Sequence, residues 1–152
     1  NHHCTCTTTQ VQRYKSKISG PLLDRIDIQI EVAPVSVTEL ARAPKGEPSA
    51  SIRERVIAAR AIQTERYKNE HGVHCNAQMS RAMIEQFAQL DAEAAQSLQR
   101  AMRRLDLSAR AYDRILKVAR TIADLDASPQ IAARHIKEAI GYRSLDRGDW
   151  GE

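Results

Sequence analysis

The chain has few of the features that mark several common classes of protein. Aromatic residues make up only 4% of it, so any hydrophobic core must be built from Ala, Ile, Leu, Val and Met. No apolar run approaches the roughly 18 residues of a membrane-spanning helix, and no charged-then-apolar leader is present. We therefore expect no membrane association. The first residue is Asn1 rather than Met, so we expect the chain to begin inside a longer protein.

Cysteines are also scarce. Three cysteines, of which Cys4 and Cys6 are separated by a single residue, make a poor disulfide framework, so we expect a reducing, cytoplasmic environment. His2 and His3 lie beside these cysteines and suggest zinc, but a second pair of ligands is missing. We therefore expect free thiols, with Cys75 packed in the core, rather than a complete zinc site.

Motifs that carry chemistry by themselves are absent as well. None of the six glycines belongs to a phosphate-binding loop, and the chain has no Gly-x-Ser-x-Gly, His-Glu-x-x-His or Cys-x-x-Cys pattern. A self-contained enzyme is therefore not expected, and this chain should show no ATPase activity alone. Its net charge of +4 permits contact with phosphate or nucleic acid without requiring it.

The N-terminal third holds one clear β pattern. Apolar residues alternate with polar ones over 26–32, which predicts a half-buried strand: Ile26, Ile28, Ile30 and Val32. No second strand is predicted, so its backbone groups lack partners within this chain. The rest of 1–47 is predicted to be mostly irregular.

From about residue 50 the apolar residues recur at helical spacing. Asp91 and Ser108 are predicted N-caps of two helices, and Ser128 followed by Pro129 predicts the start of another. The predicted fold is mainly α: a bundle of four to five helices over 48–147, preceded by an irregular segment with one unpartnered strand and followed by a tail over 148–152.

One isolated arginine and one group of three cations are candidate phosphate ligands. Arg25 follows the Ser19–Pro21 turn, and a guanidinium can bind two phosphate oxygens; the alternative is a surface arginine paired with a flanking aspartate, Asp24 or Asp27. In the group of three, Arg110 lies in the first turn of a predicted helix, and Arg114 and Lys117 continue its face. The alternative there is a solvated basic face.

Four stretches together resemble the C-terminal part of the Mg-chelatase-related AAA+ ATPases of bacteria, the ComM/YifB family. They are CTC with QVQRY (4–6 and 10–14), ISGPLLDRID (18–27), SARAYDRILKVARTIADL (108–125) and YRSLDR (142–147). The resemblance implies that 1–47 ends an AAA+ core domain, with the 26–32 strand in its sheet. It also implies that 48–147 is the helical lid over the nucleotide.

The resemblance further implies roles for individual residues. Arg25 matches the arginine finger that reaches into an adjacent subunit, and Arg110 matches the sensor-2 arginine. Arg114, on the same helix face as Arg110, is a further candidate contact to the ATP phosphates. Cys4 and Cys6 match half of a zinc site. ATP and Mg²⁺ would be bound by the full-length protein, with none expected on this part alone. The implied partners are the upstream core, a homo-oligomeric ring (a hexamer) and DNA, on which the protein would act as a helicase or branch-migration motor in transformation and recombination.

Two other functions fit parts of the pattern. A free-standing helix-turn-helix DNA-binding module would use the positive charge and the short connection between Leu105 and Ser108. A purely structural oligomerisation element is the third alternative. Whether the chain belongs to an enzyme at all depends on the resemblance.

Overall fold

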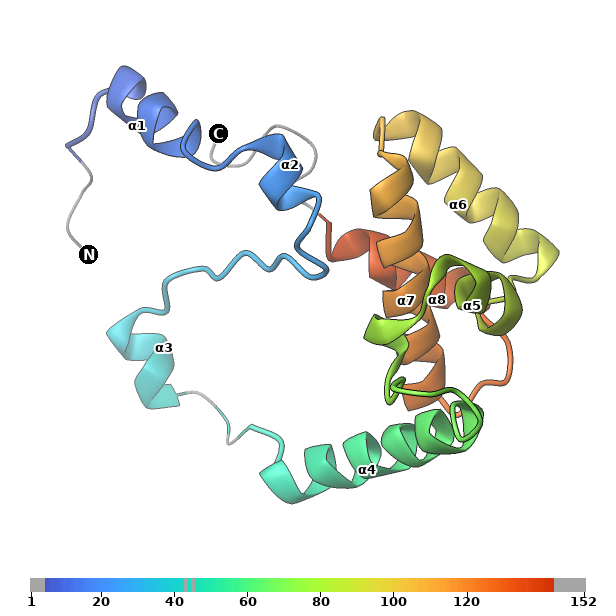
Figure 1. The fold of residues 1–152 in the computed structure, drawn as a ribbon. Coiled ribbons are helices and arrows are strands. Elements are labelled where there is room, and N and C mark those ends of the chain that lie inside the picture. The colour runs from blue at the N-terminus through green and yellow to red at the C-terminus, as the bar shows by residue number, and fades with distance from the viewer. Residues whose placement is uncertain (1–4, 43, 45, 144–152) are drawn as a thin grey trace.

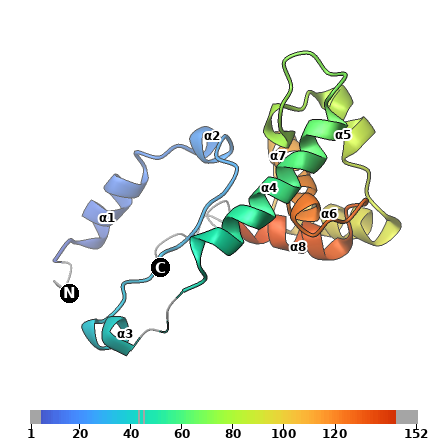
Figure 2. The same cartoon turned by 90° about the horizontal axis from the view of Figure 1, so that it is seen from below.

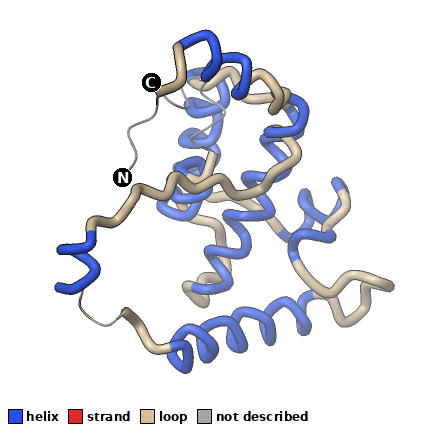
Figure 3. The backbone as a smooth tube through the Cα atoms, turned by 90° about the vertical axis from the view of Figure 1, so that its left-hand side faces the viewer, coloured by secondary structure: helices blue, strands red, loops and turns tan. Residues whose placement is uncertain are grey.

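The protein is mainly α, as the sequence predicts. The computed structural model describes residues 5–42, 44 and 46–143 (Figure 1). No strand is formed among these residues, which consist of helices and loops (Figure 3). The elements, in chain order, are α1 (Thr8–Lys15), α2 (Gly20–Leu23), α3 (Val37–Arg42), α4 (Ser49–Arg66), the 3₁₀-helix η1 (Asn76–Gln78), α5 (Arg81–Phe87), α6 (Ala92–Arg104), α7 (Ala109–Leu125) and α8 (Ala133–Gly141).

The elements from α4 to α8, hereafter the helical body, pack around α7. This helix contacts α4, α5, α8 and η1, and α6 packs on α8 (Figure 1). Three of the helices begin at a residue whose side chain caps a free backbone N–H: Ser80 for α5, Asp91 for α6 and Ser108 for α7. The predicted caps at Asp91 and Ser108 are therefore confirmed, and short connections between capped helices hold them against one another.

The core of the helical body contains mostly aliphatic side chains. Ala119 and Ala123 of α7 and Ala139 of α8 are buried in it. Tyr67 and Phe87 add an edge-to-face pair with ring centroids 5.5 Å apart. The largest fully buried aliphatic side chains are Leu98, Ile115, Ile131 and Ile136. A core of this kind is expected where aromatics are scarce.

Residues 5–42, hereafter the N-terminal segment, are built differently. Figure 2 shows α1, α2 and α3 lying to one side of the helical body. Among the residues of this segment whose side chains the structure describes, which leave out 37 and 40, Gln29 is the buried one. The segment therefore has no hydrophobic core of its own.

The predicted strand over 26–32 is not formed in the described residues. The segment is an extended loop, and its apolar residues are exposed, from 40% for Ile26 to 85% for Val32. The polar Gln29 is buried instead, and its backbone N–H donates to the C=O of Tyr142 at 2.7 Å. The described residues offer no second strand, so no β-ladder can form. The alternation of apolar and polar residues therefore does not indicate a strand here.

Three local predictions differ from the structure. Two segments predicted to be irregular contain α1 and α3. Helix α8 begins at Ala133 rather than after Ser128, whose hydroxyl instead donates to the C=O of Gln130. Cys75 is only partly buried and lies outside the core.

None of the helices in the described part of the chain combines the length and the apolar character that crossing a membrane requires.

Candidate functional site

The first candidate site is the loop that carries Arg25, directly after α2. Arg25 Nη1 donates a 2.8 Å hydrogen bond to the C=O of Pro21, and the side chain is otherwise exposed. It forms no ion pair with Asp24 or Asp27, although both lie within two residues of it and both are described. The interpretation of Arg25 as a surface arginine neutralised by its neighbours is therefore not supported by the structure.

The two aspartates are held by arginines from the helical body. Asp27 forms an ion pair with Arg114 of α7, and Asp24 Oδ1 lies 3.9 Å from Arg143 Nη2 just after α8. Arg143 is only 1% exposed, and its Nη1 donates to the C=O of Ile26 at 2.9 Å. The loop is thus held on both sides of its exposed arginine.

The second candidate site is the N-terminus of α7. Ser108 Oγ accepts a 3.2 Å hydrogen bond from the N–H of Ala111 and so fixes where the helix begins. Arg110, in the first turn, is exposed and makes no hydrogen bond or ion pair with the described residues. Its cationic side chain, together with the free N–H groups of a first helical turn, provides a place where an anion can bind.

The predicted basic stripe along α7 is only partly available. Lys117 Nζ donates to the C=O of Ala77 at 3.0 Å, and Arg114 is paired with Asp27. Of the three cations, only Arg110 lacks a partner among the described residues. Arg110 and Arg114 are one helical turn apart, so the two candidate sites are connected through Arg114 and Asp27.

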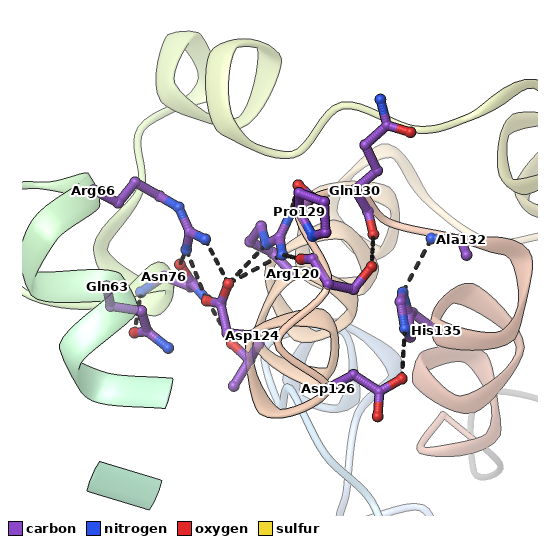
Figure 4. Close-up of polar contacts among 12 residues, drawn as sticks. Gln63, Arg66, Asn76, Arg120, Asp124, Asp126, Pro129, Gln130, Ala132 and His135 are labelled. Atoms are coloured by element: carbon purple, nitrogen blue, oxygen red, sulfur yellow. Dashed lines mark hydrogen bonds and ion pairs between the residues drawn. The ribbon is translucent and has the colours of Figure 1, made fainter. Parts of the chain in front are cut away.

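A buried polar network joins the C-terminal end of α4 to α7 (Figure 4). Arg66 binds both carboxylate oxygens of Asp124, at 2.7 and 2.5 Å. Arg120 Nε donates to the same carboxylate at 3.1 Å. Two arginines therefore share one fully buried acid, whose side chain has 0% exposure.

Asn76 of η1 completes this network. Its Oδ1 accepts hydrogen bonds from Arg66 at 2.9 Å and from the hydroxyl of Tyr67 at 2.7 Å. Its Nδ2 donates to Thr121 Oγ1 at 3.0 Å and to Asp124 Oδ2 at 2.8 Å. Every polar group of this buried amide thus has a partner, which is what makes a polar network tolerable in a protein interior.

Charge and burial change the pKa values of the two arginines in opposite directions. The hydrogen bond to Asp124 raises the pKa of Arg66 above its ordinary value, whereas burial lowers the pKa of Arg120, with Asp124 opposing that change. The remaining donors of Arg120 reach the C=O groups of Ser128 and Pro129, at 2.6 and 3.0 Å. Those contacts fix the turn and bend that follow α7, where the chain is not helical, so the predicted Ser128–Pro129 helix start is not used.

The sequence does not predict this network. Arg66 and Asp124 are 58 residues apart, and no local pattern pairs them. One signal was present: Arg120 and Asp124, at i and i+4, interrupt a helix face otherwise occupied by Leu116, Ala119 and Ala123. Opposite charges at that spacing on a buried face indicate an internal ion pair.

An apolar groove of about 380 Å³ opens between the loop over 27–30 and α7. Among the described residues that line it, Lys117 is the one lysine or arginine, and most others are apolar, such as Ile28, Ile30 and Ile122. The groove is therefore a poor match for a nucleotide phosphate. The two exposed arginines, not the groove, are the candidates for phosphate contact.

The structure gives no support for a metal centre in the part of the chain that it describes. Within that part, no three potential ligands from His, Cys, Asp and Glu are grouped. Cys4, predicted to be half of a zinc site, lies outside the described residues, and Cys6 is exposed. Cys75 Sγ lies 3.6 Å from Gln78 Oε1, its hydrogen-bond partner.

Comparison with known proteins identifies the family of this chain. A family model described as "Magnesium chelatase, subunit ChlI C-terminal" matches residues 46–143, and one described as "Magnesium chelatase, subunit ChlI" matches residues 1–40. The chain belongs to the magnesium chelatase ChlI C-terminal family, and the predicted relationship is confirmed.

Two curated relatives are similar over almost the whole chain. One is "Uncharacterized protein YifB" of Escherichia coli (strain K12), 41% identical over 148 residues, which cover 96% of this chain and 28% of that protein. The other is "Competence protein ComM" of Haemophilus influenzae, 42% identical over 146 residues, covering 95% of this chain and 28% of that protein. The chain thus spans little more than a quarter of the length of either relative.

Proposed function

We propose that this chain is the lid-bearing part of a ring-forming AAA+ ATPase that couples ATP hydrolysis to remodelling of DNA. The magnesium chelatase family match and the similarity to a competence protein support the proposal. In this proposal the upstream core of the same polypeptide binds ATP and Mg²⁺, because this chain has no phosphate-binding loop. The reaction on DNA is helicase or branch-migration activity.

Two arginines of this chain act at the phosphates. Arg25 enters the adjacent subunit of a hexameric ring as an arginine finger, and Arg110 contacts the γ-phosphate as sensor 2. Phosphoryl transfer depends mostly on positioning and on stabilising charge that develops on the phosphoryl oxygens. A guanidinium is suited to that task because it stays charged and presents a planar fork of donors.

The observation that carries this proposal is that Arg25 is exposed and forms no ion pair with its neighbouring aspartates. Acidic residues flank it, yet Asp27 is paired with Arg114, Asp24 lies 3.9 Å from Arg143, and the Arg25 side chain stays exposed. An arginine kept out of local ion pairs, in a loop contacted by α7 and by Arg143 after α8, is arranged to bind an anion on another molecule.

The helix-turn-helix alternative fits the structure less well. Its recognition helix would be α7, which must present side chains along one face to the major groove. In the structure α7 is the central helix, and its exposed residues, Ala109, Arg110 and Leu125, lie at its two ends. We expect this chain to bind duplex DNA more weakly than about 10 μM at physiological salt, as non-specific contacts do.

The test uses the full-length protein with single substitutions. Arg25→Ala and Arg110→Ala should each remove most ATP hydrolysis, by about 10³-fold or more for Arg25, while ring assembly is preserved. Arg53→Ala, at an exposed arginine on α4 with no described partner, is the matched control and should leave turnover unchanged. Normal hydrolysis in both variants would refute the roles, and tight sequence-selective DNA binding by this chain would favour the alternative.

A further inference from the structure

Four polar contacts join the loop around Arg25 to the helical body. They are the ion pair of Asp27 with Arg114, the contacts of Arg143 with Asp24 and with the C=O of Ile26, and the backbone hydrogen bond from Gln29 to Tyr142. These contacts come from α7 and from Tyr142 and Arg143, which directly follow α8. The N-terminal segment has no hydrophobic core, so they largely determine where the loop lies.

The contacts differ in strength. Arg143 is fully buried, so its hydrogen bond to a backbone carbonyl is shielded from water and fixes the main chain directly before Asp27. The side chains of Arg114 and Asp27 are partly exposed, at 30% and 46%, so their ion pair is weaker and easier to rearrange. The contact of Arg143 is suited to anchor the loop, and the pair of Arg114 with Asp27 is suited to adjust its position.

Arg114 connects this loop to the second candidate site. It lies four residues after Arg110 on α7, on the same side of one continuous helix. A helix moves as a rigid unit over one turn, so any displacement of Arg110 carries Arg114 with it. Through Asp27, the displacement reaches the loop that holds Arg25.

We propose that Arg114 and Arg143 are positioning residues that couple the lid helices α7 and α8 to the arginine finger. This inference rests on the proposed function of Arg25 and Arg110, and it assigns Arg114 a role different from the predicted contact with ATP phosphates. The Arg114 guanidinium is already bound to a carboxylate, so a phosphate would have to displace Asp27. The position of the lid in one subunit thereby sets the position of the finger that enters the next.

A charge swap tests this coupling in the full-length protein. Arg114→Asp and Asp27→Arg each place like charges together and should lower kcat for ATP by tenfold or more, with KM nearly unchanged, because a finger displaced by about 1 Å can cost up to about 10²-fold in rate. The double variant restores an opposite-charge pair and should recover much of the lost kcat. Arg81→Ala breaks the exposed pair between α5 and Asp113 of α7 and is the matched control, expected to leave kcat unchanged.

Substitutions at Arg143 give an independent measurement. Arg143→Met removes the hydrogen bond to Ile26 and should reduce kcat more than Arg114→Ala does, whereas Arg143→Lys should retain part of it. Because Arg143 is buried, thermal unfolding of each variant must be measured too. The swap at Arg114 and Asp27 involves partly exposed side chains and stays informative even if Arg143 variants unfold.

The outcomes separate this inference from the proposed function. If Arg25→Ala hydrolyses ATP normally, the finger assignment itself is refuted. If Arg25→Ala is inactive but both single charge reversals keep a normal kcat, the coupling is refuted and the finger stands. A rise in KM for ATP on Arg114→Asp that Asp27→Arg does not reverse would also refute it, in favour of direct phosphate contact by Arg114.

Discussion

The helical body and the N-terminal segment are held in place by different forces. The body buries aliphatic side chains around α7 and contains a satisfied ionic network. The segment exposes its large apolar residues, Ile28, Ile30 and Val32 among them, and contacts the body through a few polar groups. Similar residue types are used in both regions, so the difference arises from whether a second surface is present to cover them.

This contrast predicts that equivalent substitutions change the free energy of unfolding by very different amounts in the two regions. In the body, each substitution removes a contact on which neighbouring helices depend. In the segment, the same chemical change removes an interaction that water can replace. Paired variants of the isolated chain therefore measure how far the two regions differ, with urea unfolding followed by circular dichroism as the common measurement.

The largest effect is expected for the buried acid. Asp124→Asn leaves Arg66 and Arg120 buried without a counter-charge and should cost about 3–5 kcal/mol in the free energy of unfolding. Asp27→Asn, which breaks a partly exposed pair in the segment, should cost less than about 1 kcal/mol. Equal costs at the two positions would contradict the contrast.

Core packing gives the second comparison. Leu98 on α6 is 1% exposed, and Leu98→Ala should cost about 2–5 kcal/mol through lost burial and the cavity that remains. Ile30 is 67% exposed, so Ile30→Ala should change the unfolding free energy by no more than about 0.5 kcal/mol. A large loss at Ile30 in the isolated chain would mean that the segment is covered in solution.

Helix caps provide a third, smaller comparison. Ser108→Ala removes the acceptor for the N–H of Ala111 and should cost about 1 kcal/mol, because α7 is central to the body. Thr7→Ala removes a similar cap from α1, whose residues contribute nothing to the core. That variant should leave the urea midpoint unchanged while lowering helix content slightly, and a shifted midpoint would argue against the separation of the two regions.

The smallest effect is expected at low pH. Hydrogen bonds from His135 and Arg134 hold the pKa of Asp126 below its ordinary value of 3.8. A lowered folded-state pKa contributes stability that is present above pH 3.8 and is lost as the pH falls through the lower value. Asp126→Asn should therefore flatten the stability profile slightly below about pH 4. An unchanged profile in that window would show that these hydrogen bonds do not contribute.

The sequence predicts the helical body well and the segment poorly, for physical reasons. Helices α6 and α7 combine helical apolar spacing with an N-cap, so local and tertiary preferences agree. Capping-box patterns begin α1 at Thr7 and α3 at Ser36. Residues 1–17 are polar without an apolar period, and residues 34–50 contain three prolines and a glycine, so the sequence predicts irregular structure for both. For 26–32 the alternating pattern predicts a strand that no neighbouring chain segment completes.

Sequence alone singles out Arg25 and Arg110 as candidates, but it gives no partners for the residues around them. Both arginines are exposed. That Asp27 binds Arg114, 87 residues away, depends on how α7 packs and has no local signal. The start of α8 differs from the prediction for a related reason: Arg120 binds the carbonyls of Ser128 and Pro129 in a bend of the chain, so the favourable Ser-Pro pattern does not start a helix there.

The Arg66–Asp124 pair also has a consequence for the order of folding. Helix α4 buries only Ala59 and Gln63 from its own length, and its polar connection to α7 lies near its C-terminal end. Helices α6, α7 and α8 share the dense core and need no residue of α4 to bring them together. Helix α4 should therefore behave as a separate cooperative unit that docks last and detaches first, with its amide hydrogens exchanging through local opening well below the free energy of global unfolding.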